Sequence, residues 1–590
     1  MEFRKDIQIL RALAVIFVVL FHLEVGGLAS GFLGVDVFFV VSGFLMALLY
    51  KKGEAKRFFE RRARRLLPAY FATVIITLFA SLWIVLPSEL GQVATQSIYS
   101  LFFANNIGFW MQNSYFSKAD FNPLLHLWSL GVEIQFYLIV PILAWFLRKS
   151  KIFLPIFLLG SFAACIFMVG ISPKTSFFMM PLRMWEFLIG FVVAYYFTIN
   201  GGIKYNNFSF LGLFGLLCLV SIPFIKVDGD TLSRLSGHPG FFALFVCIAT
   251  VLVLIFGLPK FINQSKIGDV FSIIGNYSYS IYLVHFPIIV LYLYEPFSGT
   301  KLYPHENIDK FILLVLIIIS SILMHKFVEN RKFNSNAKVY FYSFFSIITL
   351  VVSSKFIPSI LYNQKNINIF NGLGDRAPYR CGKIVRILNP VAISCKINSE
   401  NFNKSLLLVG NSHADSIKIA FQEVSSKHGF NTYFLVSNTP LMDNSVTPEM
   451  LINEAKQLKV EKLVLHYSPD SIKIDILEKI IKLALEKNLK VDFILPVPVY
   501  LETIPKSLYF QNNKLLYSKE KYFENNKMFL NAVSILEQKH DNLRVYPVVQ
   551  ELCADVCQIA DDLYHPYYFD SNHLTLTGAK KLTPVFERIF

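Results

Sequence analysis

Residues 339–354 read VYFYSFFSIITLVVSS and carry no charged side chain, and residues 205–225 form a second long uncharged run. Such runs approach or reach the length of about 20 apolar residues that a helix needs to cross a bilayer. The whole chain has the same character, because 54% of its 590 residues are hydrophobic and only 16% are charged. These values predict an integral membrane protein, and they exclude a purely soluble enzyme, a disordered chain and a collagen-like repeat.

Apolar segments that suit a membrane-spanning helix recur along the first 361 residues. We expect eleven spans, at roughly 7–25, 32–50, 69–87, 133–147, 152–171, 181–199, 207–225, 240–258, 271–294, 310–328 and 339–361. The first ten form a helical bundle, and the last links this bundle to the remainder of the chain.

The net charge of the chain is +15, and most of the excess lies in the apolar half. If the N-terminus is cytoplasmic, the segments between the spans hold nineteen basic residues inside and six outside, which is the expected positive-inside bias. The largest cluster, KKGEAKRFFERRARR at 51–65, lies between two apolar segments. It therefore indicates membrane topology, and we expect no nucleic-acid partner. With eleven spans, everything after residue 361 lies outside the cytoplasm.

After residue 361 the composition changes, and strand-like runs alternate with helical ones. A polar, Asn-rich stretch at 362–403 precedes KSLLLVG (404–410), which has the pattern of a buried strand, and 471–488 has helical spacing. Further strand-like runs follow at 431–437, 461–467 and 491–500. Strands that alternate with helices predict a three-layer α/β domain with a parallel sheet.

The seven cysteines divide between the two halves. Three lie within apolar spans, where we expect them to be packing residues: Cys165, Cys218 and Cys247. Four lie in the outer half, where an oxidising compartment favours disulfides: Cys381, Cys395, Cys553 and Cys557. We favour the pairs 381–395 and 553–557, although sequence alone leaves other pairings open. The CxxxC spacing has no companion His or Cys pair, so we expect no metal site.

Ionisable residues inside membrane spans are unfavourable to bury and usually functional. Arg11 and His22 are eleven residues apart on the first span, so a helix places them on one face, roughly 16 Å apart. An Arg suits a phosphate, and a His suits proton abstraction from a hydroxyl. The spacing resembles the reach of a pantetheine arm, with phosphates at the cytoplasmic end and a thioester near the outer end. The structural alternative is that both side chains only satisfy nearby backbone or extend to the interface.

Further ionisable residues gather in the spans: Asp36, His126, Glu133, Arg183, Glu186, His285 and Glu329. His126 and Glu133 are seven residues apart and share one helix face. Each residue alone could be a structural contact, but together they indicate a polar cavity through the bundle. A basic cluster follows the second span: Arg61, Arg62, Arg64 and Arg65. The positive-inside bias explains its charge, and phosphate binding is the functional alternative.

Several motifs occur in order and give a resemblance to a known family over about residues 5–335. Beside the Arg11 and His22 pair, they are GFLGVDVFFVVSGFL (31–45), RRARRLLPAY (61–70), LLHLWSLGVEIQFYLIVP (124–141) and YSIYLVHFP (279–287). This half resembles acyltransferase family 3, bacterial membrane O-acyltransferases that acetylate surface polysaccharides from acetyl-CoA. In FVENRKF (327–333), Asn330 and Arg331 replace the family's usual proline, which weakens the comparison at Glu329 only.

The resemblance implies roles for particular residues. It makes His22 the catalytic histidine and places Glu133 in the active cavity. It assigns acyl-donor binding to five arginines: Arg11, Arg61, Arg62, Arg64 and Arg65. It further implies a location in the bacterial inner membrane, with acetyl-CoA as a substrate rather than a bound cofactor.

In the outer half, GNSHADS (410–416) follows a predicted strand and opens a helix. This geometry places Ser412 at a helix N-terminus, where backbone N–H groups can stabilise an oxyanion. Near the C-terminus, YFDSNHLTLTGAK (568–580) puts Asp570 and His573 three residues apart. A lone Ser beside a Gly would indicate only a turn, but with this pair it makes a workable Ser-His-Asp triad.

Residues 404–590 resemble the SGNH-hydrolase-like domain that is often fused to the membrane family. The resemblance implies that Ser412 is the nucleophile, His573 the base and Asp570 its orienting acid. Asn411 stands where the family motif more often has Asp. The Gly and Asn of the second and third family blocks have no convincing counterpart, because SNTP (437–440) and HYSPD (466–470) lie at their expected places. The oxyanion hole beyond the Ser412 amide is therefore unassigned.

The sequence thus predicts a multi-span α-helical membrane bundle followed by a three-layer α/β domain of SGNH type. The expected parts are a membrane acyltransferase domain at 1–335, a linking transmembrane helix at 336–361, a periplasmic linker at 362–403 and the SGNH-like domain at 404–590. The leading interpretation is an O-acetyltransferase that moves acetyl groups from cytoplasmic acetyl-CoA to a surface glycan, such as lipopolysaccharide O-antigen.

Two alternatives belong to other classes. A membrane-anchored carbohydrate esterase would use the triad, but an anchor needs one span and no buried Arg, His or Glu. An acyl or glycan transporter would use the buried charges, but it leaves the triad without a role. The partners that we expect are acetyl-CoA, a glycan acceptor and the lipid bilayer.

Overall fold

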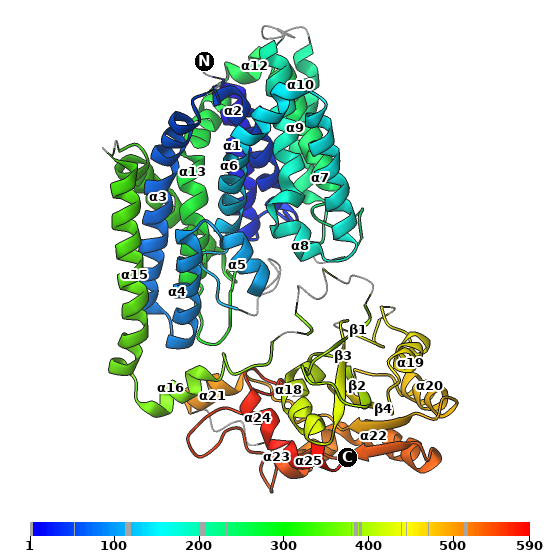
Figure 1. The fold of residues 1–590 in the computed structure, drawn as a ribbon. Helices are drawn as coiled ribbons and strands as arrows, with labels where there is room; N and C mark the ends of the chain where they lie inside the picture. The colour runs from blue at the N-terminus through cyan, green and yellow to red at the C-terminus, as the bar shows by residue number, and fades with distance from the viewer. Residues whose placement is uncertain are drawn as a thin grey trace. The chain divides into compact units, whose positions relative to one another are not determined.

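The structure is a computed structural model of the whole chain (Figure 1), and it forms two compact units, Met1–Phe356 and Ile357–Phe590. The described residues are 4–51, 53–112, 120–199, 208–229, 231, 233–235, 237–331, 333, 335–378, 380–382, 388, 392–437, 439–443, 445–469, 471–511 and 517–590.

The first unit is built from helices that pack along one another (Figure 1). Its main α-helices are α1 (Lys5–His22), α2 (Gly34–Leu49), α3 (Ala55–Ile84), α4 (Pro87–Leu101), α5 (Asn105–Gln112), α6 (Leu127–Lys149), α7 (Phe153–Val169), α8 (Pro173–Phe178), α9 (Met180–Ile199), α10 (Ser209–Ser221), α11 (Phe241–Phe256), α12 (Lys260–Asn263), α13 (Lys266–Tyr292), α14 (Asn307–Met324) and α15 (Asn336–Leu361). Short helical turns lie at Gly31–Leu33, Ile222–Phe224 and His325–Glu329.

Six helices in the described residues are long and apolar enough to cross a membrane: Gly31–Leu49, Ala55–Ile84, Leu127–Lys149, Lys266–Tyr292, Asn307–Glu329 and Asn336–Leu361. Each corresponds to one of the eleven predicted spans. Three shorter apolar helices, Phe153–Val169, Ser209–Phe224 and Phe241–Phe256, correspond to three more. The multi-span character is therefore confirmed, and the count of eleven stays a prediction.

Helices α2 and α9 approach each other so closely that glycines are required on both. A Cβ atom on Gly43 of α2 would lie 1.9 Å from the Phe187 carbonyl oxygen of α9. Reciprocally, a Cβ on Gly190 of α9 would lie 1.9 Å from the Val40 carbonyl oxygen of α2. Small residues at helix crossings are typical of membrane bundles, where packing rather than the hydrophobic effect holds helices together. This crossing fixes α2, whose other residues line the cavity described below.

The second unit is a three-layer α/β domain around a six-stranded sheet. Its strands are β1 (Ser394–Lys396), β2 (Lys404–Gly410), β3 (Phe430–Leu435), β4 (Lys462–His466), β5 (Lys490–Ile494) and β6 (Leu543–Tyr546), in the order β1-β3-β2-β4-β5-β6. All neighbours are parallel except β1, which is antiparallel to β3. Its helices are α16 (Gln364–Asn371), α18 (Ser412–Lys427), α19 (Pro448–Gln457), α20 (Ile474–Leu485), α21 (Ile504–Phe510), α22 (Lys519–Lys539), α23 (Val549–Leu552), α24 (Leu576–Lys581) and α25 (Thr583–Glu587).

The alternation of side chains along β2 creates one hydrophobic core on each face of the sheet. Leu406 and Leu408 pack into the core that α18 covers, together with Phe421. Leu407 and Val409 pack into the opposite core, beneath α19, α20 and α22. Since successive residues of a strand point to opposite faces, this short apolar strand is buried on both sides. The predicted α/β layer architecture is confirmed.

The described parts of the stretch 362–403 include regular secondary structure. It supplies α16 and the edge strand β1, whose Cys395 pairs in register with Phe434 of β3. Asp375 accepts hydrogen bonds from the backbone N–H and the hydroxyl of Thr577, at 3.1 and 2.7 Å, in the first turn of α24. The three-residue β1 has no alternating pattern that would reveal it in the sequence.

The α2–α9 crossing gives a test of the bundle. Gly43→Ala should lower the thermal stability of the detergent-solubilised protein, because relieving the overlap with the Phe187 carbonyl costs about 1–3 kcal/mol. Gly160→Ala in α7 is the matched control, since a Cβ there meets nothing within 4 Å, and it should leave the melting temperature unchanged or slightly raised. Equal melting temperatures for the two variants would contradict this packing.

Candidate active sites in the bundle and in the α/β domain

A cavity of about 80 Å³ lies inside the helical bundle and is lined by residues from five helices. Its charged and hydroxyl-bearing lining consists of Arg11 (α1), Ser42 (α2), Arg62 and Arg65 (α3), Ser129, Glu133 and Tyr137 (α6), and Ser278, Tyr279 and Tyr282 (α13). Apolar residues of α2, among them Phe38 and Leu45, complete the wall. Of the ionisable residues predicted to form a polar cavity with the first span, Arg11 and Glu133 line this one.

Glu133 is the acidic centre of this cavity. The Ser42 hydroxyl donates a hydrogen bond of 2.5 Å to its carboxylate, and the Tyr137 hydroxyl donates a second one. On the opposite wall, the Tyr279 hydroxyl donates to the Leu66 carbonyl at 2.9 Å, which ties α13 to the helix that carries the arginines. Three guanidinium groups thus share this cavity with one carboxylate, so the lining has an excess of positive charge, which suits an anionic ligand.

The structure separates the five predicted donor-binding arginines into two groups. Arg11, Arg62 and Arg65 line the cavity. Arg61 and Arg64 lie on the exposed side of α3 and are not among its lining residues. Arg61 instead reaches the Leu49 carbonyl at 3.4 Å. Residues that the sequence analysis did not single out, Ser42, Tyr137 and Tyr282, line the cavity beside Glu133. Tyr137 could have been found, because it lies one helical turn after Glu133.

His22 is the last residue of α1, and it lies in a group of aromatic rings rather than in the lining of the cavity. Its ring centroid is 5.3 Å from that of His285 and 5.0 Å from that of Phe286. The ring of His126 lies 5.7 Å from that of His285. His22 and His126 therefore belong to one group of rings, which His285 connects.

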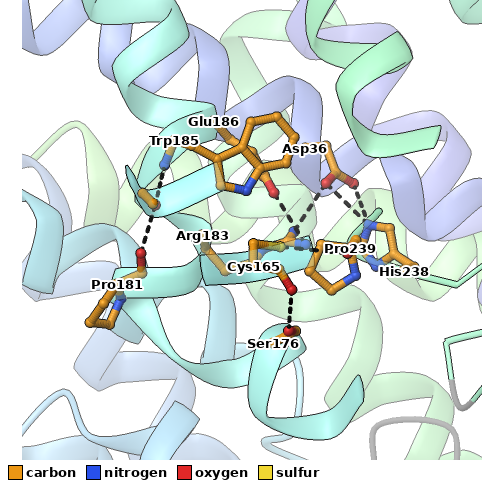
Figure 2. A network of polar contacts seen from close by, with 10 residues as sticks. Asp36, Cys165, Ser176, Pro181, Arg183, Trp185, Glu186, His238 and Pro239 are labelled. Carbon is orange, nitrogen blue, oxygen red and sulfur yellow. Dashed lines mark hydrogen bonds and ion pairs between the residues drawn. The ribbon is translucent and has the colours of Figure 1, made fainter. Parts of the chain in front are cut away.

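Three other buried charges predicted to line the cavity instead form a closed ion-pair network (Figure 2). The Arg183 guanidinium contacts Asp36 at 3.0 Å and Glu186 at 3.2 Å, and all three side chains are fully buried. The ring of His238 contacts the same Asp36 carboxylate at 3.1 Å. These contacts join α2, α9 and the segment before α11. The prediction that they line the cavity is wrong, and their role is structural.

In the α/β domain, the structure brings the three predicted triad residues together. His573 Nε2 lies 2.6 Å from Ser412 Oγ, and His573 Nδ1 lies 2.7 Å from a carboxylate oxygen of Asp570. The other Asp570 oxygen accepts backbone N–H groups of Asn572 and His573, at 2.9 and 2.8 Å. A carboxylate can only accept, so it fixes the hydrogen on Nδ1 and leaves the Nε2 lone pair for the serine hydroxyl.

The electrostatics of the triad follow from these contacts. Partial burial alone would raise the pKa of Asp570, but the hydrogen bond from His573 and its charge hold that pKa below the ordinary value. The Asp570 carboxylate is therefore ionised at neutral pH and can stabilise a protonated His573 during catalysis.

Ser412 is positioned by the turn between β2 and α18. A Cβ on Gly410 would lie 1.8 Å from the His466 carbonyl oxygen, so only glycine lets β2 end this close to β4. Asn411 caps α18 by accepting the His413 N–H at 3.1 Å. Its amide group also donates to the Ser468 hydroxyl at 2.7 Å. Asn411 thus joins the nucleophile turn to the loop after β4, which an acceptor-only Asp could not do in the same way.

Ser412 is the first residue of the sixteen-residue α18. Its own backbone N–H belongs to the helix N-terminus, where such donors can stabilise an oxyanion. From the two sequence blocks considered for the remaining donors, Asn438 and Asp470 lie outside the described residues.

Both predicted disulfides are present, Cys381–Cys395 and Cys553–Cys557. The first attaches the segment before β1 to the edge of the sheet, and in that segment Arg380 donates a hydrogen bond of 3.0 Å to the Gly410 carbonyl. Cys165 and Cys247 are buried in the bundle, as expected of packing residues.

The comparisons with known proteins agree with this two-part organisation. Residues 4–326 match the model of the acyltransferase domain of acyltransferase family 3. Residues 383–588 match the model of an SGNH domain that occurs fused to such acyltransferase domains. The chain therefore belongs to acyltransferase family 3, in the branch whose membrane domain carries an SGNH domain.

Three relatives show the extent of the similarity. The chain is 29% identical to the O-acetyltransferase OatA of Staphylococcus aureus (strain NCTC 8325 / PS 47) over 352 residues, 54% of this chain and 55% of that protein. It is 31% identical to the peptidoglycan O-acetyltransferase OatA of Listeria monocytogenes over 321 residues, 49% and 50% of the two chains. It is 31% identical to BcsY of Komagataeibacter xylinus, named as a membrane-bound transacylase, over 337 residues. These residues are 55% of this chain and 82% of that protein.

The chain spans about half the length of the OatA relatives. No solved structure matches the chain.

The triad lies beside two buried imidazoles that should make the α/β domain sensitive to acid. The ring of His413 is 5.0 Å from that of His573 and 6.1 Å from that of His466. Burial lowers the pKa of His413 well below its ordinary value and the pKa of His466 to about 4. Both rings are therefore neutral in the folded domain, whereas in the unfolded chain they take up protons below about pH 6.5.

The stability of the domain should consequently fall as the pH decreases from 6.5 towards 4, by about 3 kcal/mol from His466 alone. His466→Asn cannot be protonated, and its amide can still donate to the Ile494 carbonyl that the His466 Nδ1 contacts at 3.1 Å. We expect this variant to lose less stability over that range, measured by hydrogen exchange of the sheet amides in the solubilised full chain. His428→Asn at the surface is the control. A wild-type pH dependence in His466→Asn would contradict the assignment.

Proposed function

We propose that the protein is an O-acetyltransferase that moves acetyl groups from cytoplasmic acetyl-CoA across the bacterial inner membrane to hydroxyls of a cell-surface glycan. The observation that carries this proposal is the presence of two chemical sites in one chain, an arginine-lined cavity in the bundle and a complete Ser-His-Asp triad in the α/β domain. An esterase needs only the triad, and a transporter needs only the cavity.

The cavity would receive the acyl donor. Arg11, Arg62 and Arg65 offer planar forks of N–H donors that suit phosphate oxygens, and Glu133 lies among them. A space of about 80 Å³ is too small for the whole nucleotide. We therefore infer that the adenosine part of acetyl-CoA stays outside the described cavity and that the arginines hold the phosphates at its mouth.

His22 would act as the base for the first transfer. As a hydroxyl oxygen attacks the thioester carbonyl carbon, the imidazole takes the hydroxyl proton. The new C–O bond forms, the C–S bond breaks, and the sulfur leaves with its electron pair and receives the proton. The position of His22 at the end of α1, eleven residues from Arg11, suits the length of an extended thioester arm.

The triad would complete transfer to the glycan. His573 Nε2 takes the proton of Ser412 Oγ, which attacks the carbonyl carbon of the acetyl ester made in the first transfer. The C–O bond of that ester breaks, its alcohol leaves with the proton from His573, and acetyl-Ser412 remains. A sugar hydroxyl then attacks this ester, its proton passes to His573, and Ser412 leaves as the alcohol after reprotonation. The backbone N–H groups at the start of α18 stabilise the negative oxygen in both steps.

For the acceptor we propose a glycan outside the inner membrane. Lipopolysaccharide O-antigen is one possibility within this class, and the name of the Listeria relative adds peptidoglycan. Mass spectrometry of surface glycans from cells with and without the protein identifies the polymer and the acetylated hydroxyl.

The proposed function is tested by separating the two sites genetically. His22→Ala and Ser412→Ala should each lower glycan acetylation by at least about 10³-fold, because each removes a group that forms or breaks bonds. Ser412→Ala should still bind acetyl-CoA, and Asp570→Asn should be milder than His573→Ala, since the aspartate only orients the base. The readouts are acetyl-glycan mass spectrometry and equilibrium binding of acetyl-CoA.

His305→Ala and Ser416→Ala are the matched controls, an exposed histidine of the bundle and a second serine of α18. Both should retain wild-type acetylation. Full acetylation by Ser412→Ala would make the outer domain a glycan-positioning module. Full acetylation by His22→Ala would show that His22 is not the base of the first transfer.

The route requires that the two sites face opposite sides of the membrane. A reporter enzyme that is active only outside the cytoplasm should work when fused after residue 361 and should fail when inserted in 51–65, because the basic segment stays inside. Fusion proteins of equal abundance provide the control. Activity at the second position would reverse the orientation and, with it, the direction of acetyl transfer.

A further inference from the structure

Three histidine rings meet at the end of α1. His22, His126 and His285 come from α1, the start of α6 and α13, and each is at most 1% exposed. The ring centroids are 5.3 Å apart for His22 and His285 and 5.7 Å apart for His126 and His285. Phe286 packs against all three rings at 5.0 to 6.1 Å and encloses the group with apolar surface.

Backbone carbonyls determine which nitrogen of two of these rings carries the hydrogen. His285 Nδ1 lies 2.7 Å from the Tyr282 carbonyl oxygen, and His126 Nε2 lies 3.0 Å from the Leu283 carbonyl oxygen. A carbonyl oxygen can only accept a hydrogen bond, so these two nitrogens are the donors. In a neutral imidazole the other nitrogen then carries a lone pair. These lone pairs are on His285 Nε2 and His126 Nδ1.

Both lone pairs are buried, and neither nitrogen has a hydrogen-bond partner among the described residues. A buried acceptor without a partner costs about 1–3 kcal/mol, so two of them side by side indicate a missing donor. The described residues contain no group of His, Cys, Asp and Glu that could hold a metal ion. The donor that fits two neutral lone pairs is a hydroxyl-bearing molecule.

Tyr282 places these lone pairs next to the acyl-donor cavity. Its side chain lines the cavity, and its carbonyl orients His285. Its hydroxyl donates to the His126 carbonyl at 2.9 Å and lies 2.6 Å from the Ser129 hydroxyl, which also lines the cavity. One residue therefore contacts both the acyl-donor cavity and the backbone and ring that hold the two imidazole acceptors.

We propose that His126 and His285 form a binding site for a hydroxyl group beside His22, which holds either the alcohol that takes the acetyl group or a water molecule in its place. The hydroxyl donates to His285 Nε2 or His126 Nδ1, and its oxygen is left near the thioester. His126 and His285 are thus positioning residues for the oxygen that His22 activates. That the bound hydroxyl belongs to the molecule that takes the acetyl group rests on the proposed function. That the two nitrogens accept a hydrogen bond does not rest on it.

The direct test is nitrogen NMR of the full chain, labelled with ¹⁵N-histidine and embedded in lipid nanodiscs, first in buffer and then with glycerol as the alcohol probe. His285→Asn and His126→Gln assign the signals, since each keeps an amide N–H for the same carbonyl but removes the ring lone pair. We expect His285 Nε2 and His126 Nδ1 to show accepted hydrogen bonds.

The two sources of the hydroxyl give different outcomes. A change of these two signals on addition of glycerol assigns the site to an alcohol, and accepted hydrogen bonds that glycerol does not change assign it to water. Bare lone pairs in both conditions, or rings protonated on both nitrogens, would overturn the proposal. Release of coenzyme A by the wild-type nanodiscs tests the proposed function separately.

The kinetic consequence provides a second readout on the same samples. If an alcohol is bound, His285→Asn should raise the KM for that alcohol about five- to tenfold, the effect of one lost hydrogen bond, and leave the KM for acetyl-CoA unchanged. If water is bound, the same variant should instead change the rate of acetyl-CoA hydrolysis. The exposed His305→Asn is the control. An increase in the KM for acetyl-CoA alone would place these residues in donor binding and overturn the assignment.

Discussion

Charged side chains inside a bilayer need partners within the protein, and this constraint organises the helical bundle. Arg183 meets it with two carboxylates, Asp36 and Glu186, at 3.0 and 3.2 Å. Since removing one member of a buried pair leaves an uncompensated charge, the network holds α2 against α9 at the crossing where Gly43 and Gly190 allow backbone contact. The position of α2 in turn defines one wall of the cavity.

The arginines that line the cavity, unlike Arg183, have fewer carboxylate partners than charges. Arg11, Arg62 and Arg65 share their space with the single carboxylate of Glu133, which already accepts hydrogen bonds from Ser42 and Tyr137. Their positive charge therefore exceeds the negative charge that the lining offers, which is what an anionic substrate requires. The contrast between these two clusters distinguishes a structural network from a candidate binding site, although both consist of the same residue types.

Local patterns in the sequence predicted what depends on local geometry. The Arg11 and His22 spacing, the strand before Ser412 and the Asp570–His573 spacing are all set by one helix, one turn or one loop, and the structure contains each of them. Both disulfide pairs were also predicted. The short β1 was missed because three residues carry no periodic signal.

Contacts between distant segments that no motif marks were not predictable. His238 lies 202 residues from its partner Asp36, and nothing in the sequence around either residue indicates the pair. The arginine cluster shows a subtler limit. Arg62 and Arg65 share one face of α3, and Arg61 and Arg64 share another, because both pairs are three residues apart. Helical period alone gives two equivalent faces, and only the packing of α3 decides that the first one lines the cavity.

The two candidate bases differ in the groups that orient them, and the surroundings explain the difference. His573 has a carboxylate partner, and the Asp570 side chain remains 37% exposed, so water helps to keep it ionised. His22 is 1% exposed in the membrane unit, and its ring neighbours include His285, Phe21 and Phe286. An ionised carboxylate there would need a buried counter-charge, whereas neutral imidazoles held by backbone carbonyls need none. The bundle therefore arranges proton acceptors without net charge where the α/β domain uses an aspartate.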